Sequence, residues 1–335
     1  MCLKEASGDR ATKSRVGAQL IDAETDAHLW AERFDRDTRD LFALQDEITG
    51  RIANTLRLVM IRAATARPSN NPDALDYIFR GRAASAKPPS PEKYEETIGL
   101  FERALTLDPQ SVEAKTLLAG TLAARVLDGM TRSAASDVKR ADDLVREVLA
   151  ASPLSTGAHW AKGQLLRAQN RFDDAIPEYE AVLASDRNSA GVLHALAQCK
   201  MLTGSIEETI PLEEYAIRLS PHDPLVGNWY EWIGRVHLLQ SRIDEAIVWF
   251  EKARSANPRH PNPHIFLAAA YALRGDTQHA TAELAEARKL RGEGSFSSIA
   301  RMRAGRLWGS LPPKIRSLYD ATYFAGLRKA GMPEE

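Results

Sequence analysis

A small residue recurs at nearly constant spacing over the larger part of this 335-residue chain. The copies are Thr97, Ala141, Ala175, Thr209, Ala246 and Ala280, and three of the five spacings between them are 34 residues. A period of 34 residues accommodates two helices and their turns, and such a unit cannot bury its apolar face alone. The chain is therefore expected to stack helix pairs around one continuous core.

The residues around each copy fit the second helix of such a pair. The frame of Phe101 and Pro109 returns at Phe250 and Pro258. A proline just past a helix suits a position where the helix must stop. In the predicted first helices, glycines twelve residues before the small residue, such as Gly163, allow the paired helices to approach closely.

A helix-turn-helix unit of this period resembles the tetratricopeptide repeat. The best copy spans residues 230–258, whereas other copies depart from the pattern. Lys115 and His159 replace the large aromatic residue of the first helix, and Arg187 and Gly292 replace the final proline. The resemblance implies an all-α fold, a helix-turn-helix repeat superhelix (tetratricopeptide solenoid) with a short N-terminal β-hairpin and helix.

This resemblance also predicts how the chain is divided. About six tetratricopeptide-like repeats are expected over residues 73–292, and a helical C-terminal tail over 293–335. The longest spacing, 44 residues, places about ten extra residues near 128–136. They are expected to form a loop or an extended helix end.

The first 72 residues have a different pattern. Residues 16–34 alternate weakly about a polar turn and predict a β-hairpin. Residues 40–62 carry apolar side chains at three- and four-residue spacing and predict a helix. Residues 64–72 are polar and contain two prolines, so they predict a linker.

Residues 19–36 and 41–48 resemble the junction segment of bacterial multidomain signalling proteins, and residues 323–335 resemble the tail of their cyclase-linked members. In that family a class III adenylate/guanylate cyclase or winged-helix domain comes first. A small α/β domain related to the TolB amino-terminal domain follows, and then tetratricopeptide repeats. By this resemblance residues 1–63 are a remnant of the α/β domain. The hypothesis is a truncated member, or a reading frame begun late.

The resemblance carries no catalytic residue over to this chain. A cyclase needs paired aspartates on strands for two metal ions, and the sequence contains no such segment. It also contains no phosphate-binding glycine loop and no nucleophile motif. The chain is therefore expected not to be an enzyme, and to use no cofactor and no metal.

Charge and apolar content narrow the class of partner. The 44 Lys and Arg residues balance 45 Asp and Glu residues, which gives no general attraction to nucleic acid. No uninterrupted apolar run reaches about 18 residues, so no membrane span is expected. Cys2 and Cys199 are far apart and do not indicate a disulfide framework. We expect a cytoplasmic location, or a periplasmic one if the parent protein has an upstream membrane span.

Stacked helix pairs leave an inner groove lined by the first helix of each pair. Aromatic, amide and charged side chains in such a groove suit a bound peptide or helix. The alternative is a solvated inner face without a ligand. The candidate groove-binding residues are Trp160, Gln164, Arg167, His194, Gln198, Met201, Asn228, Glu231, Arg235 and Leu238.

These patterns predict a protein-protein interaction scaffold. It would be the regulatory or sensory C-terminal part of a bacterial signalling protein without its output domain. One alternative is a part of a nucleotide cyclase whose catalytic domain is missing from this chain. Another is a non-functional truncated remnant. The expected partner is a protein or peptide in the groove, with no nucleic acid.

Overall fold

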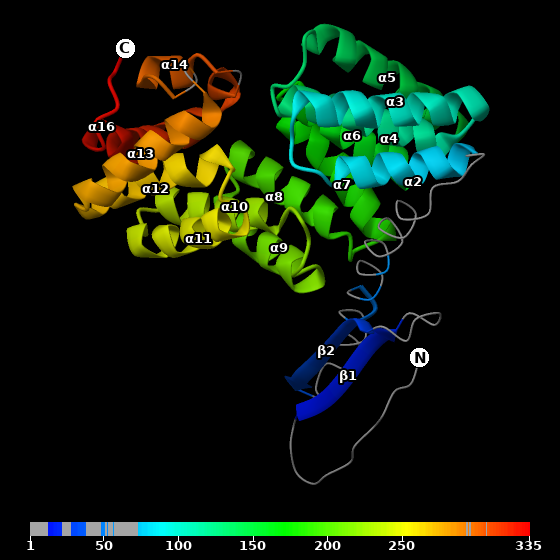
Figure 1. Cartoon of the computed structure of the whole chain (residues 1–335), viewed down its shortest axis with the longest axis horizontal. Coiled ribbons are helices and arrows are strands. Elements are labelled where there is room, and N and C mark those ends of the chain that lie inside the picture. Colours follow the sequence, from blue (N-terminus) through cyan, green and yellow to red (C-terminus); the bar gives the residue numbers. More distant parts are fainter. Residues whose placement is uncertain are drawn as a thin grey trace.

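The computed structural model describes residues 13–21, 28–37, 48–50, 52, 56, 73–292, 294, 296–305 and 307–335. Between residues 74 and 291 six antiparallel helix pairs follow one another and stack side by side (Figure 1). The predicted all-α repeat superhelix is therefore confirmed. The pairs are α2 (Ala74–Ser85) with α3 (Pro91–Leu107), α4 (Val112–Leu127) with α5 (Ala134–Ala151), α6 (Thr156–Ala168) with α7 (Phe172–Ser185), α8 (Ala190–Thr203) with α9 (Ile206–Leu219), α10 (Val226–Leu239) with α11 (Ile243–Ala256), and α12 (Pro261–Arg274) with α13 (Thr277–Arg291).

The recurring small residues lie where the two helices of a pair touch. All six belong to the second helix of their pair and have no solvent exposure. Across the contact, a Cβ atom built on Gly163 would lie 2.4 Å from the Tyr179 ring, and one on Gly234 would lie 2.6 Å from the Phe250 ring. The glycine and the aromatic residue therefore fit each other, and close packing of this kind leaves no room for a methyl group.

In each of the last four pairs, the turn inside the pair contains one residue with a positive φ angle. It is Asn170 between α6 and α7, Gly204 between α8 and α9, Ser241 between α10 and α11, and Gly275 between α12 and α13. Each lies five residues before the small residue of its pair. Glycine and asparagine adopt this conformation more readily than other residues, which explains their use at a tight helix end.

The extra residues of the second pair lengthen both of its helices. Helix α4 has 16 residues and α5 has 18, whereas the helices from α7 to α12 have 14 each. The turn between α4 and α5 is fastened by Asp137, whose carboxylate accepts hydrogen bonds from Arg125 Nε at 2.9 Å and Thr131 Oγ1 at 2.6 Å. The extra residues thus form both a loop and longer helix ends, which were expected as alternatives.

The N-terminal hairpin is present and slightly longer than expected. Strand β1 (Lys13–Ile21) pairs antiparallel with β2 (His28–Asp37), and Val16 lies opposite Phe34. Residues 48–50, 52 and 56 are helical, while the rest of the expected helix 40–62 and the linker 64–72 lie outside the described residues. A Cβ atom built on Gly50 would lie 2.9 Å from Asn188 Cβ, so this turn of helix rests directly on the repeat array.

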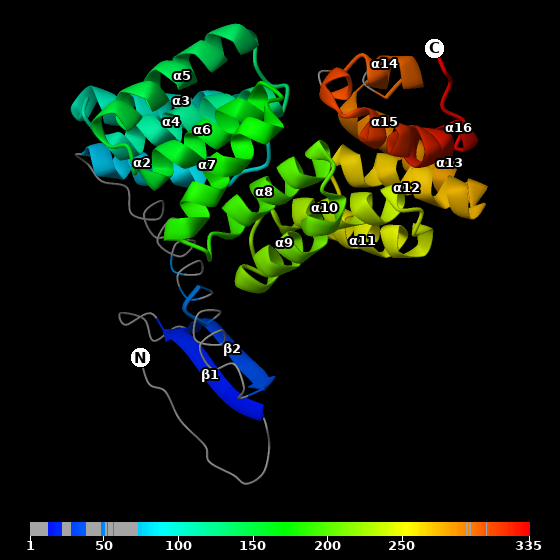
Figure 2. The same cartoon turned by 180° about the vertical axis from the view of Figure 1, so that it is seen from behind.

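The C-terminal tail forms α14 (Ile299–Arg303), a 3₁₀ turn η2 (Trp308–Ser310), α15 (Pro313–Tyr319), a π-helical turn η3 (Asp320–Phe324) and α16 (Ala325–Lys329). Figures 1 and 2 show this tail lying against α12 on the side away from α11. Its end is tied back by the Ile299 amide, which donates to the Pro333 carbonyl at 3.0 Å. Within the described part of the chain, no helix is both long enough and apolar enough to cross a membrane.

Candidate functional site

The inner face of the third pair carries an ordered set of polar and aromatic side chains. Gln164 Oε1 accepts hydrogen bonds from Arg167 Nη1 at 2.6 Å and from the Tyr179 hydroxyl at 3.0 Å. The Trp160 ring lies 5.6 Å from the Tyr179 ring. Trp160, Gln164 and Arg167 are all half-buried, so each keeps some contact with solvent. Tyr179, in the second helix of the pair, therefore fixes the orientation of these three α6 side chains.

The fourth pair places a polar triad one repeat further along. His194 Nδ1 lies 2.8 and 3.0 Å from the two carboxyl oxygens of Glu213, and the Gln198 amide nitrogen donates to His194 Nε2 at 2.7 Å. This pattern places the imidazole proton on Nδ1, where it is donated to Glu213. Gln198 is 7% exposed, and its side-chain oxygen has no hydrogen-bond partner in the described structure.

Burial sets the charge state of this triad. It lowers the pKa of His194 well below its usual value, and the positive charges of Arg167 and Arg235 lower it further. Burial also raises the pKa of Glu213 well above its usual value, against the attraction of Arg167. Both shifts favour the uncharged forms of His194 and Glu213. The positive charge on this part of the inner face therefore comes from the two guanidinium groups.

Glu213 was not among the sequence candidates, although the repeat phase marks it. Four residues after the small residue, other pairs carry Phe101, Val145, Tyr179, Phe250 and Leu284, all apolar or aromatic. Only the α8–α9 pair has a carboxylate there, and it has no solvent exposure. Aligning the sequences of the six units shows this exception. Burying an acidic side chain costs free energy unless it has a hydrogen-bonding partner.

The fifth pair directs its inner side chains toward the C-terminal tail. The carboxylate of Glu231 accepts a hydrogen bond from Arg235. The Arg235 guanidinium lies 4.4 Å from both the Trp232 and the Phe266 ring centroids, which is cation–π geometry. Burial raises the pKa of Tyr319 in the tail, and the positive charge of Arg235 opposes this shift. Asn228 is half-buried.

Two candidate groove residues belong to the core. Met201 and Leu238 both have 0% exposure and lie in the main apolar cluster, so their placement on the groove surface was wrong. The physical reason is that the apolar seam between neighbouring pairs takes in this edge of the first helix. The same helical phase holds Arg167 in α6, which is half-buried and donates a hydrogen bond to Gln164.

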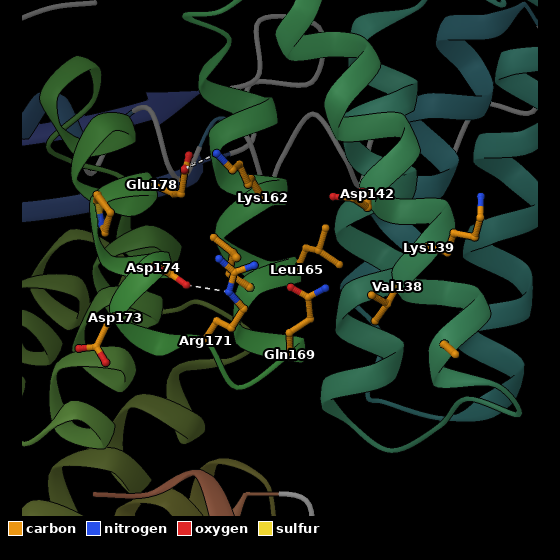
Figure 3. Close-up of a pocket in the computed structure, with 13 residues that line it drawn as sticks. Val138, Lys139, Asp142, Lys162, Leu165, Gln169, Arg171, Asp173, Asp174 and Glu178 are labelled. Carbon is orange, nitrogen blue, oxygen red and sulfur yellow. Dashed lines mark hydrogen bonds and ion pairs between the residues drawn. The ribbon is translucent and has the colours of Figure 1, made fainter.

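A second concave region lies on the other side of the array, between α5, α6 and α7. It is a cleft of 760 Å³ (Figure 3). Its charged side chains already have partners: Lys162 pairs with Glu178 at 2.7 Å and Arg171 with Asp174 at 2.6 Å. These two ion pairs neutralise four of the lining charges, and Asp173, which also lines the cleft, belongs to neither pair.

Histidine takes the place of the large aromatic residue in two pairs. His264 Nδ1 lies 2.6 Å from Glu283 Oε2, and Nε2 lies 3.0 Å from the Pro258 carbonyl oxygen. His159 makes the same two contacts with Glu178 and the Pro153 carbonyl. At His264 both partners are oxygen atoms that accept hydrogen bonds, so the protonated imidazole donates from both ring nitrogens and ties three segments together.

This clamp predicts a pH-dependent stability. The hydrogen bond to Glu283, with that to Pro258, raises the pKa of His264 above its usual value. The stabilisation of the folded state by this clamp is thus complete below about pH 6.5, and it is lost as the pH rises through the folded-state pKa of His264. We expect His264→Gln to lower the free energy of unfolding by about 1 kcal/mol at low pH and by less at high pH. Urea unfolding of both proteins between pH 6 and 9 measures this, and a difference independent of pH would contradict it.

No group of three or more His, Cys, Asp or Glu side chains in the described segments is placed to hold a metal ion. The chemistry of the inner face therefore depends on its hydrogen-bonding and aromatic groups. These groups can bind and orient another polar or aromatic surface, and none of them forms a nucleophile-base pair.

Comparison with known proteins agrees with the architecture. A tetratricopeptide repeat family matches residues 129–191. The crystal structure of the APC/C hetero-tetramer Cut9–Hcn1 is similar over 82% of this chain and 49% of that chain, with 14% identity and a TM-score of 0.56. A tetratricopeptide protein of Thermus thermophilus, TTC0263, matches 59% of this chain and 98% of its own, with 19% identity and a TM-score of 0.47. The repeat match covers residues 129–191, and the stacked helix pairs share the fold of tetratricopeptide-repeat proteins.

A curated relative matches about half of this chain. It is named "Putative adenylate cyclase 3" and comes from Rhizobium meliloti (strain 1021). The two sequences are 29% identical over 169 residues, which is 49% of this chain and 29% of that protein. The match thus spans less than a third of the relative's length.

Proposed function

We propose that this chain binds a peptide or helix of another protein along the inner face of α6 and α8, as the regulatory part of a bacterial signalling protein. The observation that carries the proposal is the fixed orientation of Gln164 and His194. Tyr179 and Glu213 hold these side chains from the second helix of each pair. The tail packs on the neighbouring α10 and α12, whereas among the described residues no tail contact of this kind is made with α6 and α8.

Pre-orientation matters for affinity because binding otherwise costs the ordering of each interface side chain, about 0.5–1.5 kcal/mol. Trp160 adds a large aromatic surface beside the polar groups, and tryptophan is enriched among residues that dominate binding energy. Arg167 supplies a positive charge, which suits an acidic or carbonyl-rich segment. The proposed partner is therefore a peptide with an aromatic or aliphatic anchor and an acidic side chain.

Replacing Trp160 by alanine tests this surface. We expect the affinity for the partner to fall about tenfold or more, because a buried aromatic anchor is lost. A photo-crosslinking amino acid at position 160 should capture the partner in cells, and calorimetry with the purified partner should give the loss. Val248 in α11 is 50% exposed on another helix and serves as the control position. Equal crosslinking at 160 and 248 would rule out a specific inner-face site.

The adenylate cyclase relative favours a second candidate, in which these repeats belong to a cyclase. Its catalytic domain would lie outside this chain, so we expect the purified chain to form no cyclic nucleotide from ATP or GTP. Turnover above a buffer blank would instead establish catalysis by the chain itself. Added to the catalytic domain of the relative, the chain should change the rate of cyclic AMP formation if it has a regulatory role.

A further inference from the structure

The C-terminal tail does not continue the repeat array. In the array, the first helix of each pair packs on the second helix of the pair before it, as α12 packs on α11. The tail instead places α16 and η3 on α12, and η3 also on α10. These are the first helices of two successive pairs, and they form the inner face. The tail thus lies where a bound helix would lie.

The tail packs closely against the inner face, as a bound helix would. The Tyr323 ring centroid lies 4.4 Å from the Phe266 ring centroid. A Cβ atom built on Gly326 would lie 2.4 Å from the Ala269 carbonyl oxygen, so the two helix backbones touch there. Only glycine allows this approach.

The buried side chains of the tail form one stripe. Ile315, Tyr319, Tyr323 and Leu327 are spaced by four residues, and none is more than 6% exposed. This spacing places them on one helix face, which is the pattern of a helix bound in a groove. The π-helical turn at residues 320–324 lies in the middle of the stripe. Turns of this kind are rare and interrupt regular helix.

We propose that the inner face of α10 and α12 is a helix-binding site, and that residues 313–329 of the same chain are its ligand in cis. The site accepts a helix with aromatic side chains at positions i and i+4, glycine at i+7 and leucine at i+8. A partner helix with this pattern reaches α10 and α12 only when the tail leaves. The tail therefore keeps partners off α10 and α12 while it is bound.

The test uses the full chain and a labelled peptide of residues 311–331. A tethered ligand acts at an effective concentration on the order of millimolar, so the wild-type chain should not bind the free peptide measurably. Gly326→Leu forces the tail away from Ala269, and this variant should bind the peptide at least about tenfold more tightly than wild type. Gly309→Leu is the matched control, because a Cβ atom there meets nothing within 4 Å.

Two further measurements separate the possible outcomes. Tyr323→Ala should also bind the peptide, and a peptide carrying Gly326→Leu should bind none of the variants. Absence of binding by both displaced variants, with their helical circular dichroism retained, overturns the proposal. Unfolding of both variants overturns it too, since the tail is then a permanent part of the core. The inference extends the proposed function, yet its probe is a peptide of this chain, so it fails or succeeds separately from crosslinking at position 160.

Discussion

Replacing Phe250 by alanine should lower the free energy of unfolding by about 3–5 kcal/mol, the cost of emptying a large buried aromatic site. The Phe250 side chain has no solvent exposure, and its ring meets Gly234 on one side. On the other side it stacks on Phe266 with ring centroids 5.2 Å apart. Removal of the ring therefore leaves a cavity between two helix pairs that backbone movement can only partly close.

The effect of Phe250→Ala should extend to the tail. Phe266 contacts both Phe250 and Tyr323, so loosening the first contact reduces the packing at the second. Chemical denaturation followed by circular dichroism measures the loss of stability, and hydrogen exchange of α16 measures its release. Val248→Ala, two residues away and 50% exposed, should change stability by less than about 0.5 kcal/mol. Equal losses for the two variants would show that Phe250 is not a core residue.

Gly163→Ala should lower the free energy of unfolding by about 1–3 kcal/mol, because the added methyl group overpacks the helix contact. A Cβ atom at this position would lie 2.4 Å from the Tyr179 ring, which also has no solvent exposure. Tyr179 must then move, and its hydrogen bond to Gln164 is lost with it. The substitution should thus weaken partner binding at α6 as well as stability.

Gly99→Ala is expected to change the stability of the same fold in the opposite direction. Gly99 lies inside α3, and a Cβ atom there meets nothing within 4 Å. Alanine should raise the free energy of unfolding by about 0.5–1 kcal/mol, because it lowers the entropy of the unfolded chain and favours helix. Thermal and urea unfolding of both variants measure the two signs. Stabilisation by Gly163→Ala would show that the contact with Tyr179 is not close.

The repeat period alone predicts the helix pairs because it is a local property. Ala175 and Ala246 repeat at the phase where paired helices touch, and Gly163 and Gly234 mark the opposite wall of that contact. The stop at Pro258 and the helical spacing around it likewise depend only on neighbouring residues. These signals lie within one unit, so no knowledge of the rest of the fold is needed to see them.

The chemistry of the inner face was predicted less completely. Trp160, Gln164 and His194 follow from counting along the first helices, yet Met201 and Leu238 at a later phase are buried. Whether such a side chain faces solvent depends on how far the next pair closes over it. That distance is set by packing between units, which the spacing of one unit does not contain.

The position of the tail is a property of the tertiary structure. Residues 313–329 are helical by local pattern, but nothing in that pattern distinguishes a seventh packing layer from a helix laid across α10 and α12. The difference arises because Gly326 meets Ala269 and Tyr323 meets Phe266, contacts between residues more than 50 positions apart. Local periodicity thus specified the repeating unit, whereas long-range packing decided which part of its inner face stays open to a partner.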